Sequence, residues 1–124
     1  MNFNPLAFRN IALRISSSLK SCRDIPLKKK EEEAWIRTGI SRLYYAAFLI
    51  ARDKLSLNSY TRSDVHKLVI NKLANIDPIA KDKLSELRKK RNQADYNIRE
   101  RMTINDLLWS LAIAEDVIKR LLKN

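Results

Sequence analysis

The segment 87–96, with the sequence LRKKRNQADY, carries the residues of this chain that are best suited to chemistry. It has helical periodicity, and the stripe that would face a core consists of Leu84, Leu87, Arg91 and Ala94. A guanidinium on such a stripe has a large desolvation cost, so Arg91 needs an anionic partner, a hydrogen-bond network or a ligand. Asp95, one helical turn further on, is the nearest partner in the sequence. A structural ion pair and a functional anion site both fit this pattern.

Basic residues are concentrated around the same segment. The chain of 124 residues has 25 Lys and Arg against 14 Asp and Glu, a formal charge of +11 that favours polyanionic partners. A basic cluster lies within two dozen residues around this segment: Lys81, Lys83, Arg88, Lys89, Lys90, Arg91, Arg99 and Arg101. We expect this cluster not to be cancelled by acidic residues, unlike residues 28–30, three lysines followed by three glutamates. Such a surface can hold nucleic acid through phosphate contacts. The alternative is a solvated, lysine-rich helical surface.

The elements that position this segment are predicted to be helices. The chain has one glycine and three prolines, and no stretch alternates apolar and polar residues as a strand would. We therefore predict an all-α protein of one domain over residues 1–124, an up-and-down four-helix bundle with an additional short helix.

Capping signals place the helix boundaries. The first two helices are expected at about residues 5–19 and 30–55, and residues 21–27 around Pro26 form the first connection. The short third helix has Thr61 or Ser63 as its N-cap. The fourth begins with Asp77 as N-cap and Pro78 in its first turn, and it ends with the segment around Arg91. The last runs from Thr103, in a capping-box-like arrangement with Asp106, to about Leu122.

The second helix is predicted to carry a polar strip beside its apolar face. Ser41, Arg42, Tyr45 and Arg52 recur on this strip at helical spacing. Arg42 and Tyr45 are candidate nucleic-acid-binding residues, together with Arg88, Lys89 and Lys90. A partly exposed packing role is the alternative for Tyr45.

The last helix has two apolar stripes, one of which consists of Trp109, Ile113 and Val117. Two apolar stripes on one helix predict that the helix packs against two different neighbours. We expect the tryptophan stripe either to complete the core or to be buried against a second copy of the chain.

Neither a metal site nor a disulfide framework is expected. The single Cys22 cannot form an intramolecular disulfide, and no Cys/His cluster has zinc-ligand spacing. A lone histidine such as His66 is more often a surface or capping residue than a catalyst. We expect no cofactor, no membrane partner and a cytoplasmic location. A membrane-surface amphipathic protein ranks last, because the wide apolar faces need a bundle core.

Three motifs together resemble the HEPN family. They are SRLYYAAF at residues 41–48, His66-Lys67 after a polar loop, and RNQADY at residues 91–96 before a capped final helix. The resemblance covers about residues 5–122. The resemblance implies a small helical bundle that is usually a homodimer. Many members of the family are ribonucleases of toxin–antitoxin, CRISPR-linked or other defence systems. Others are non-catalytic and work beside a nucleotidyltransferase.

The ribonuclease members of that family use an arginine followed about four to six residues later by a histidine, brought together from two subunits. Arg91 and Asn92 match the start of this motif, but Asp95 and Tyr96 stand where histidine is expected. The unperturbed pKa of histidine is about 6.5, whereas that of tyrosine is about 10, and Arg91 should lower the pKa of Asp95. His66 could substitute only if the fold brought it to Arg91.

Two hypotheses follow from the resemblance. In the first, the protein binds RNA or nucleotide in a basic groove at a homodimer interface and acts as a metal-independent endoribonuclease with a degenerate motif. Paired Arg91 residues would bind the scissile phosphate, Asn92 would orient them, and Asp95 or Tyr96 would contact the 2′-hydroxyl.

In the second hypothesis the protein is a non-catalytic dimeric module that binds nucleic acid or nucleotide, or docks on a nucleotidyltransferase. Arg91 and Asp95 would then form an ion pair that fixes the end of the fourth helix, while Tyr44, Tyr45 and Tyr96 pack around it.

Overall fold

The computed structural model describes residues 3–21 and 31–123. Within them it contains five helices and no strand: α1 (Leu6–Ser21), α2 (Glu32–Lys54), α3 (Val65–Leu73), α4 (Pro78–Tyr96) and α5 (Ile104–Leu122). The prediction of an all-α protein is confirmed for this part of the chain. Cys22, the expected connection around Pro26 and the three lysines at 28–30 lie outside the described residues.

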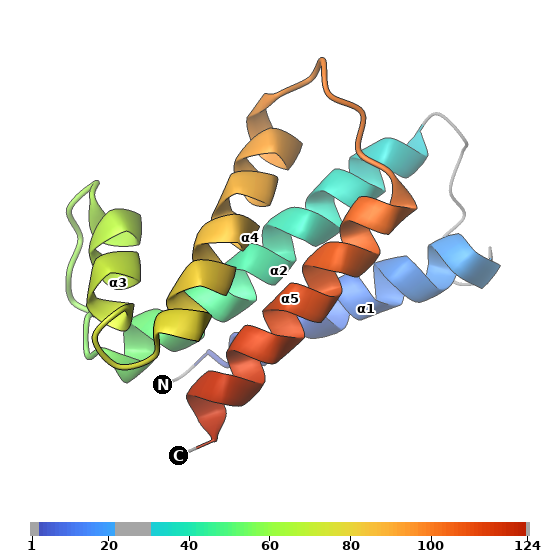
Figure 1. Cartoon of the computed structure of the whole chain (residues 1–124). Coiled ribbons are helices and arrows are strands. Elements are labelled where there is room, and N and C mark those ends of the chain that lie inside the picture. Colours follow the sequence, from blue (N-terminus) through green and yellow to red (C-terminus); the bar gives the residue numbers. More distant parts are fainter. Residues whose placement is uncertain (1–2, 22–30, 124) are drawn as a thin grey trace.

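The four long helices form a bundle, and α2 lies at its centre. It packs against α1, α4 and α5, and the short α3 is attached to α2 and α4 at one end (Figure 1). Consecutive long helices run in opposite directions, so the C-terminal half of α4 lies beside the N-terminal half of α2 (Figure 1). This arrangement brings the segment around Arg91 to the polar strip of α2.

The core consists of the apolar stripes that the helical periodicity predicts. From α2 it contains residues such as Ile40, Leu43 and Ala47, all fully buried. Gly39 lets α5 approach closely, because a Cβ atom at that position would lie 2.7 Å from Cδ1 of Leu107. Burial of these side chains supplies the main driving force for the bundle.

Two of the three predicted N-caps are present. The carboxylate of Asp77 accepts a hydrogen bond from the amide of Ala80 at 3.0 Å, with Pro78 as the first residue of α4. Before α5, Asp106 Oδ2 accepts from the amide of Thr103 at 2.8 Å, as in a capping box.

The predicted cap of the third helix was wrong. Neither Thr61 nor Ser63 occupies the N-cap position of α3; Asp64 does, without a side-chain hydrogen bond to the helix. The hydroxyl of Tyr60 instead donates a hydrogen bond to the carboxylate of Asp64, with a donor–acceptor distance of 2.6 Å. A tyrosine four residues before the N-cap thus competes with the helix amides for this acceptor.

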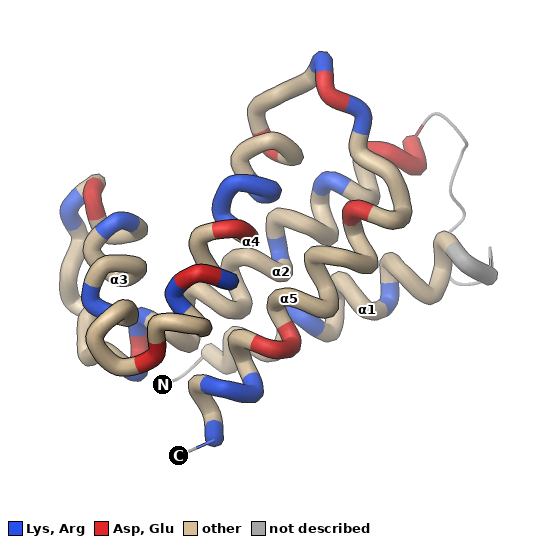
Figure 2. Tube along the Cα trace, in the orientation of Figure 1, with Lys and Arg blue, Asp and Glu red and all other residues tan. Residues whose placement is uncertain are grey.

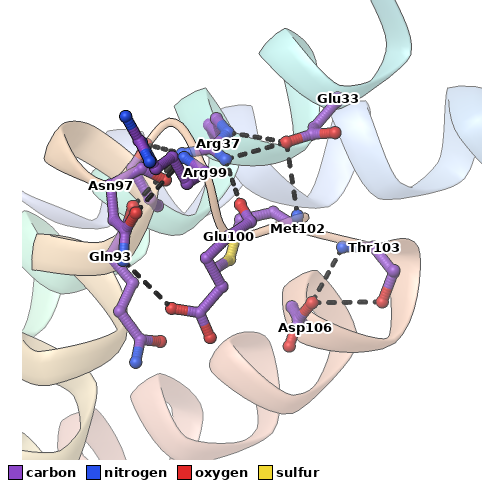
Figure 3. A network of polar contacts seen from close by, with 10 residues as sticks. Glu33, Arg37, Gln93, Asn97, Arg99, Glu100, Met102, Thr103 and Asp106 are labelled. Carbon is purple, nitrogen blue, oxygen red and sulfur yellow. Dashed lines mark hydrogen bonds and ion pairs between the residues drawn. The ribbon is translucent and has the colours of Figure 1, made fainter.

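Arg37 of α2 holds the C-terminal end of α4 and the loop that follows it (Figure 3). Its guanidinium donates hydrogen bonds to the carbonyl oxygens of Gln93, Ala94 and Asn97 at 3.1, 2.9 and 3.1 Å, and to that of Glu100. These include carbonyls that the end of a helix leaves without intrahelical partners. One side chain therefore caps α4 and orders the loop.

Glu33, one turn before Arg37 on α2, completes this network. It forms an ion pair with Arg37 at 2.8 Å and accepts a hydrogen bond from the amide of Met102 at 3.3 Å. The hydrogen bonds from Arg37 and Met102 lower the pKa of Glu33. Sequence reasoning did not single out this pair, although the spacing of four residues was a signal for it.

The tryptophan stripe of α5 divides between core and surface. Val117 is fully buried, Ile113 is half-buried, and Trp109 remains 39% exposed. The stripe completes the core only at its C-terminal end. Across the described ranges, no helix has both the length and the apolar content that crossing a bilayer requires.

Candidate functional site

Arg91 lies on the side of α4 that faces α2, and it is only 9% exposed. The other members of its stripe, Leu84, Leu87 and Ala94, are buried as well. The predicted stripe is therefore confirmed, and Arg91 is the arginine buried within it. Such burial requires partners for the guanidinium.

All three guanidinium nitrogens of Arg91 have polar neighbours. Nε lies 3.0 Å from Oδ2 of Asp95, an ion pair without hydrogen-bond alignment. Nη1 donates to the side-chain oxygen of Asn92 at 2.8 Å, and Nη2 donates to the hydroxyl of Tyr45. The ion pair that the sequence suggested is thus present, and Tyr45 of α2 adds a partner from another helix.

Three tyrosine rings surround the same guanidinium. Its carbon lies 5.0 Å from the ring centroid of Tyr45, 5.4 Å from that of Tyr44 and 5.7 Å from that of Tyr96. Such cation–π contacts stabilise a weakly hydrated guanidinium. The packing that the non-catalytic hypothesis expected around Arg91 is found.

Asp95 connects this pair to α2. The hydroxyl of Ser41 donates to Oδ2 of Asp95 at 3.2 Å, and Arg42 donates to the oxygen of Ser41 at 3.3 Å. The guanidinium of Arg42 also lies over the rings of Phe8 and Tyr45, at 5.0 and 5.2 Å from their centroids. Arg42, Ser41, Asp95 and Arg91 therefore form one polar chain along the α2–α4 contact.

His66 is half-buried and is not the cap of α3, a position that Asp64 occupies. Its ring stacks on Phe48 with centroids 4.2 Å apart and contacts the rings of Tyr44 and Tyr45. Nδ1 lies at hydrogen-bond distance, 2.7 Å, from the hydroxyl of Tyr44. His66 thus shares two aromatic neighbours with Arg91.

The surroundings of His66 keep its ring neutral at pH 7. Burial, followed by the charges of Arg88, Arg91 and Arg52, lowers the pKa of His66 to about 4. Burial also raises the pKa of Tyr44. The pair Tyr44–His66 is therefore an uncharged hydrogen-bonded pair beside several guanidinium groups.

Arg88 and Arg42 have no carboxylate partner in the described part of the chain. The Nε atom of Arg88 is buried without a hydrogen bond, and no ion pair with an acidic residue is formed. We call the group Arg42, Tyr44, Tyr45, His66, Arg88 and Arg91 the arginine–aromatic cluster. It brings together, from three helices, residues that lie up to 49 positions apart in the chain, with two unpaired positive charges.

The other predicted nucleic-acid-binding residues lie elsewhere. Lys90 points towards α5, where it pairs with Asp106 at 3.1 Å and lies over the ring of Trp109. Lys89 is exposed and pairs with Glu86 at 3.7 Å. Tyr96 is 72% exposed, although its ring reaches Arg91. The basic run at 88–90 therefore does not form one surface.

The expectation that the basic cluster is not cancelled was wrong for most of its members. Lys81, Lys83, Lys89, Lys90 and Arg91 each have an acidic partner. Figure 2 shows acidic positions between the basic ones along α4, and further acidic positions on the neighbouring α5. The partners of Lys83 and Lys90 come from α5, more than a dozen residues away, so the local charge pattern did not reveal them.

Within the residues that the structure describes, no three His, Cys, Asp or Glu side chains gather where a metal ion could be held. The site is a set of arginines, aromatic rings and one neutral histidine on a five-helix bundle. No protein-family model, curated protein or solved structure matches this chain.

Proposed function

We propose that this protein is a HEPN-like module that binds the phosphate groups of RNA or of a nucleotide at the arginine–aromatic cluster. The observation that carries the proposal is that two guanidinium groups near the Arg91–Asp95 ion pair have no carboxylate partner among the described residues: Arg88, one turn before Arg91 on α4, and Arg42, which donates to Ser41. Unpaired arginines next to aromatic faces are the groups that bind phosphates and stack on bases.

In this proposal Arg91 organises the site rather than carrying the ligand. Its nitrogens are occupied by Asp95, Asn92 and Tyr45, and it is nearly buried. The ion pair holds the end of α4 against α2, so that Arg88 and Arg42 keep their positions. This arrangement favours the non-catalytic reading of the HEPN resemblance, with a homodimer or a nucleotidyltransferase as protein partners.

Binding of a short single-stranded RNA tests the proposal. We expect Arg88→Gln and Arg42→Gln each to weaken binding and to reduce the slope of log K against log salt by about 0.7, because each removes one phosphate contact. Arg14→Gln is the matched control, since Arg14 is an exposed arginine on α1, which does not pack on α4. Equal effects of all three substitutions would mean that the RNA is held only by non-specific attraction to the net charge, and they would contradict the proposal.

A metal-independent ribonuclease is the second candidate, and the position of His66 favours it. His66 lies beside Tyr44 and near Arg88 and Arg91 and is neutral at pH 7, so it has a free electron pair for a proton, whereas Asp95 is already paired with Arg91. The pKa of about 4 makes His66 a weaker base than an ordinary histidine. We expect single-stranded RNA to be cleaved in the presence of a chelator, and His66→Gln and Arg91→Ala to abolish cleavage. Activity that survives both substitutions rules out this candidate.

A further inference from the structure

A polar pocket lies on the other flank of α4, between α4 and α5. Its volume is about 390 Å³, within the range of about 300–1,000 Å³ that small-molecule pockets occupy. Successive residues of an α-helix are rotated by about 100° around its axis. Lys90 and Gln93, which line the pocket, therefore point away from Arg88 and Asp95. The pocket is therefore separate from the arginine–aromatic cluster.

The indole of Trp109 forms one wall of this pocket and is 39% exposed. The amine of Lys90 lies 5.3 Å from its ring centroid and is held there by Asp106. The other carboxylate oxygen of Asp106 accepts from the amide and the hydroxyl of Thr103. The charge of Asp106 is thus already compensated, and part of the Trp109 side chain stays exposed beside the Lys90 amine.

Two carboxamides line the pocket beside the indole, Gln93 from α4 and Asn105 from α5. Among the described residues, neither side chain forms a hydrogen bond. Each offers donors and an acceptor, the combination that recognises the edge of a nucleobase. Lys89, whose contact with Glu86 is long and exposed, lies at the same pocket as a cation for a phosphate.

We propose that this pocket binds an unpaired nucleobase, stacked on Trp109, with its edge facing Gln93 and Asn105. Every base has a face that stacks on an indole, and the free amides and the lysine supply the polar contacts that a nucleotide needs. The pocket uses residues outside the arginine–aromatic cluster, so the inference does not depend on the proposed function.

Fluorescence of Trp109 tests this inference directly. The chain has two tryptophans, so Trp35→Phe leaves Trp109 as the only indole. The two probes are adenosine 5′-monophosphate and ribose 5-phosphate, which carries the same sugar phosphate without a base. We expect saturable quenching by adenosine 5′-monophosphate alone.

A calorimetric titration of the same nucleotide supplies the second measurement, carried out in the Arg42→Gln/Arg88→Gln background so that binding at the arginine–aromatic cluster does not contribute. Trp109→Ala should weaken binding about fivefold or more, because it removes the stacking surface. Asn105→Ala, at an exposed position, should weaken it with little effect on folding. Trp35→Phe is the matched control and should keep the affinity.

Three outcomes would overturn the inference: no quenching, equal quenching by ribose 5-phosphate, or unchanged affinity in Trp109→Ala. A concentration-dependent shift of the Trp109 emission, with a dimer in sedimentation and no response to nucleotide, would assign the pocket to a second copy and overturn it as well. Arg88→Gln and Arg42→Gln should leave the quenching unchanged, so this test and that of the proposed function fail independently.

Discussion

The burial of Arg91 depends on partners from two helices. Asp95 and Asn92 come from α4 itself, and Tyr45 comes from α2. A charged side chain at 9% exposure is stable only when its charge and its donors are matched in this way. Removing the guanidinium leaves the partly buried carboxylate of Asp95 without its ion pair and with the hydrogen bond from Ser41.

Substitutions of Arg91 test this account through stability. We expect Arg91→Ala to lower the free energy of unfolding by about 2 kcal/mol, less than for a fully buried pair, because the Asp95 side chain is 25% exposed. Arg91→Lys should recover only part of this loss, since a lysine lacks the planar fork. Urea unfolding measures both, with the exposed Lys89→Ala as control. An unchanged midpoint in Arg91→Ala would show that the network contributes nothing.

His66 makes a second prediction at the residue scale. Its folded-state pKa of about 4 lies below the unfolded value of about 6.5, and removal of a nearby positive charge should raise it. We expect Arg88→Gln to raise the pKa of His66 in an NMR titration of the ring. Arg62→Gln removes an equal charge that is not among the causes of the shift. The same change in both variants would mean that only net charge matters.

At the scale of elements, Arg37 determines how α4 ends. Its bonds to four carbonyls replace the helix amides that are missing beyond Tyr96, and they fix the loop that leads to α5 (Figure 3). The loop exposes Ile98, at 88%, so apolar burial of that side chain does not hold it in place. Arg37, Glu33 and the buried side chain of Met102 are therefore the contacts that position it.

Hydrogen exchange tests the role of Arg37. We expect Arg37→Gln to accelerate amide exchange over residues 97–103, because a glutamine reaches fewer of the carbonyls and Glu33 loses its ion pair. Exchange in α3 should not change, since α3 lies near the N-terminal end of α4 whereas this loop follows its C-terminal end (Figure 1). Acceleration spread evenly over all helices would indicate global destabilisation rather than a local function of Arg37.

At the scale of the whole molecule, ion pairs join the ends and flanks of different helices. Asp77 before α4 pairs with Arg120 of α5 at 3.0 Å, and Lys83 of α4 pairs with Asp116 of α5. A hydrogen bond from the partner lowers the pKa of Asp77, of Asp116 and, through Arg37, of Glu33. Because the net charge is +11, loss of these carboxylates adds to the repulsion within the bundle.

The pH dependence of unfolding should therefore have two parts. The lowered pKa of His66 contributes stability that is complete above about pH 6.5 and is lost as the pH falls towards about 4. The lowered carboxylate pKa values contribute stability that is complete above about pH 4.5 and is lost as the pH falls through their folded values.

Urea midpoints across the pH range measure both parts. His66→Gln should remove the decline between about pH 6.5 and 4, and Asp77→Asn should reduce the decline at lower pH. Profiles that coincide with that of the unsubstituted protein would contradict this assignment.

The sequence by itself determined the features that depend on residues within about one helical turn of each other. The helices, the caps at Asp77 and Asp106, and the burial of Arg91 with its partner Asp95 all follow from such short spacings. The all-α class follows from the same periodicity.

Only the tertiary structure decided which side chains meet across helices. Tyr45 reaches Arg91 from 46 residues away, and Tyr44 reaches His66 from 22 residues away. Lys90 and Arg91 are neighbours in sequence but face α5 and α2 respectively, so their partners differ. Helix spacing sets the direction of a side chain, whereas the packing of the bundle sets what lies in that direction.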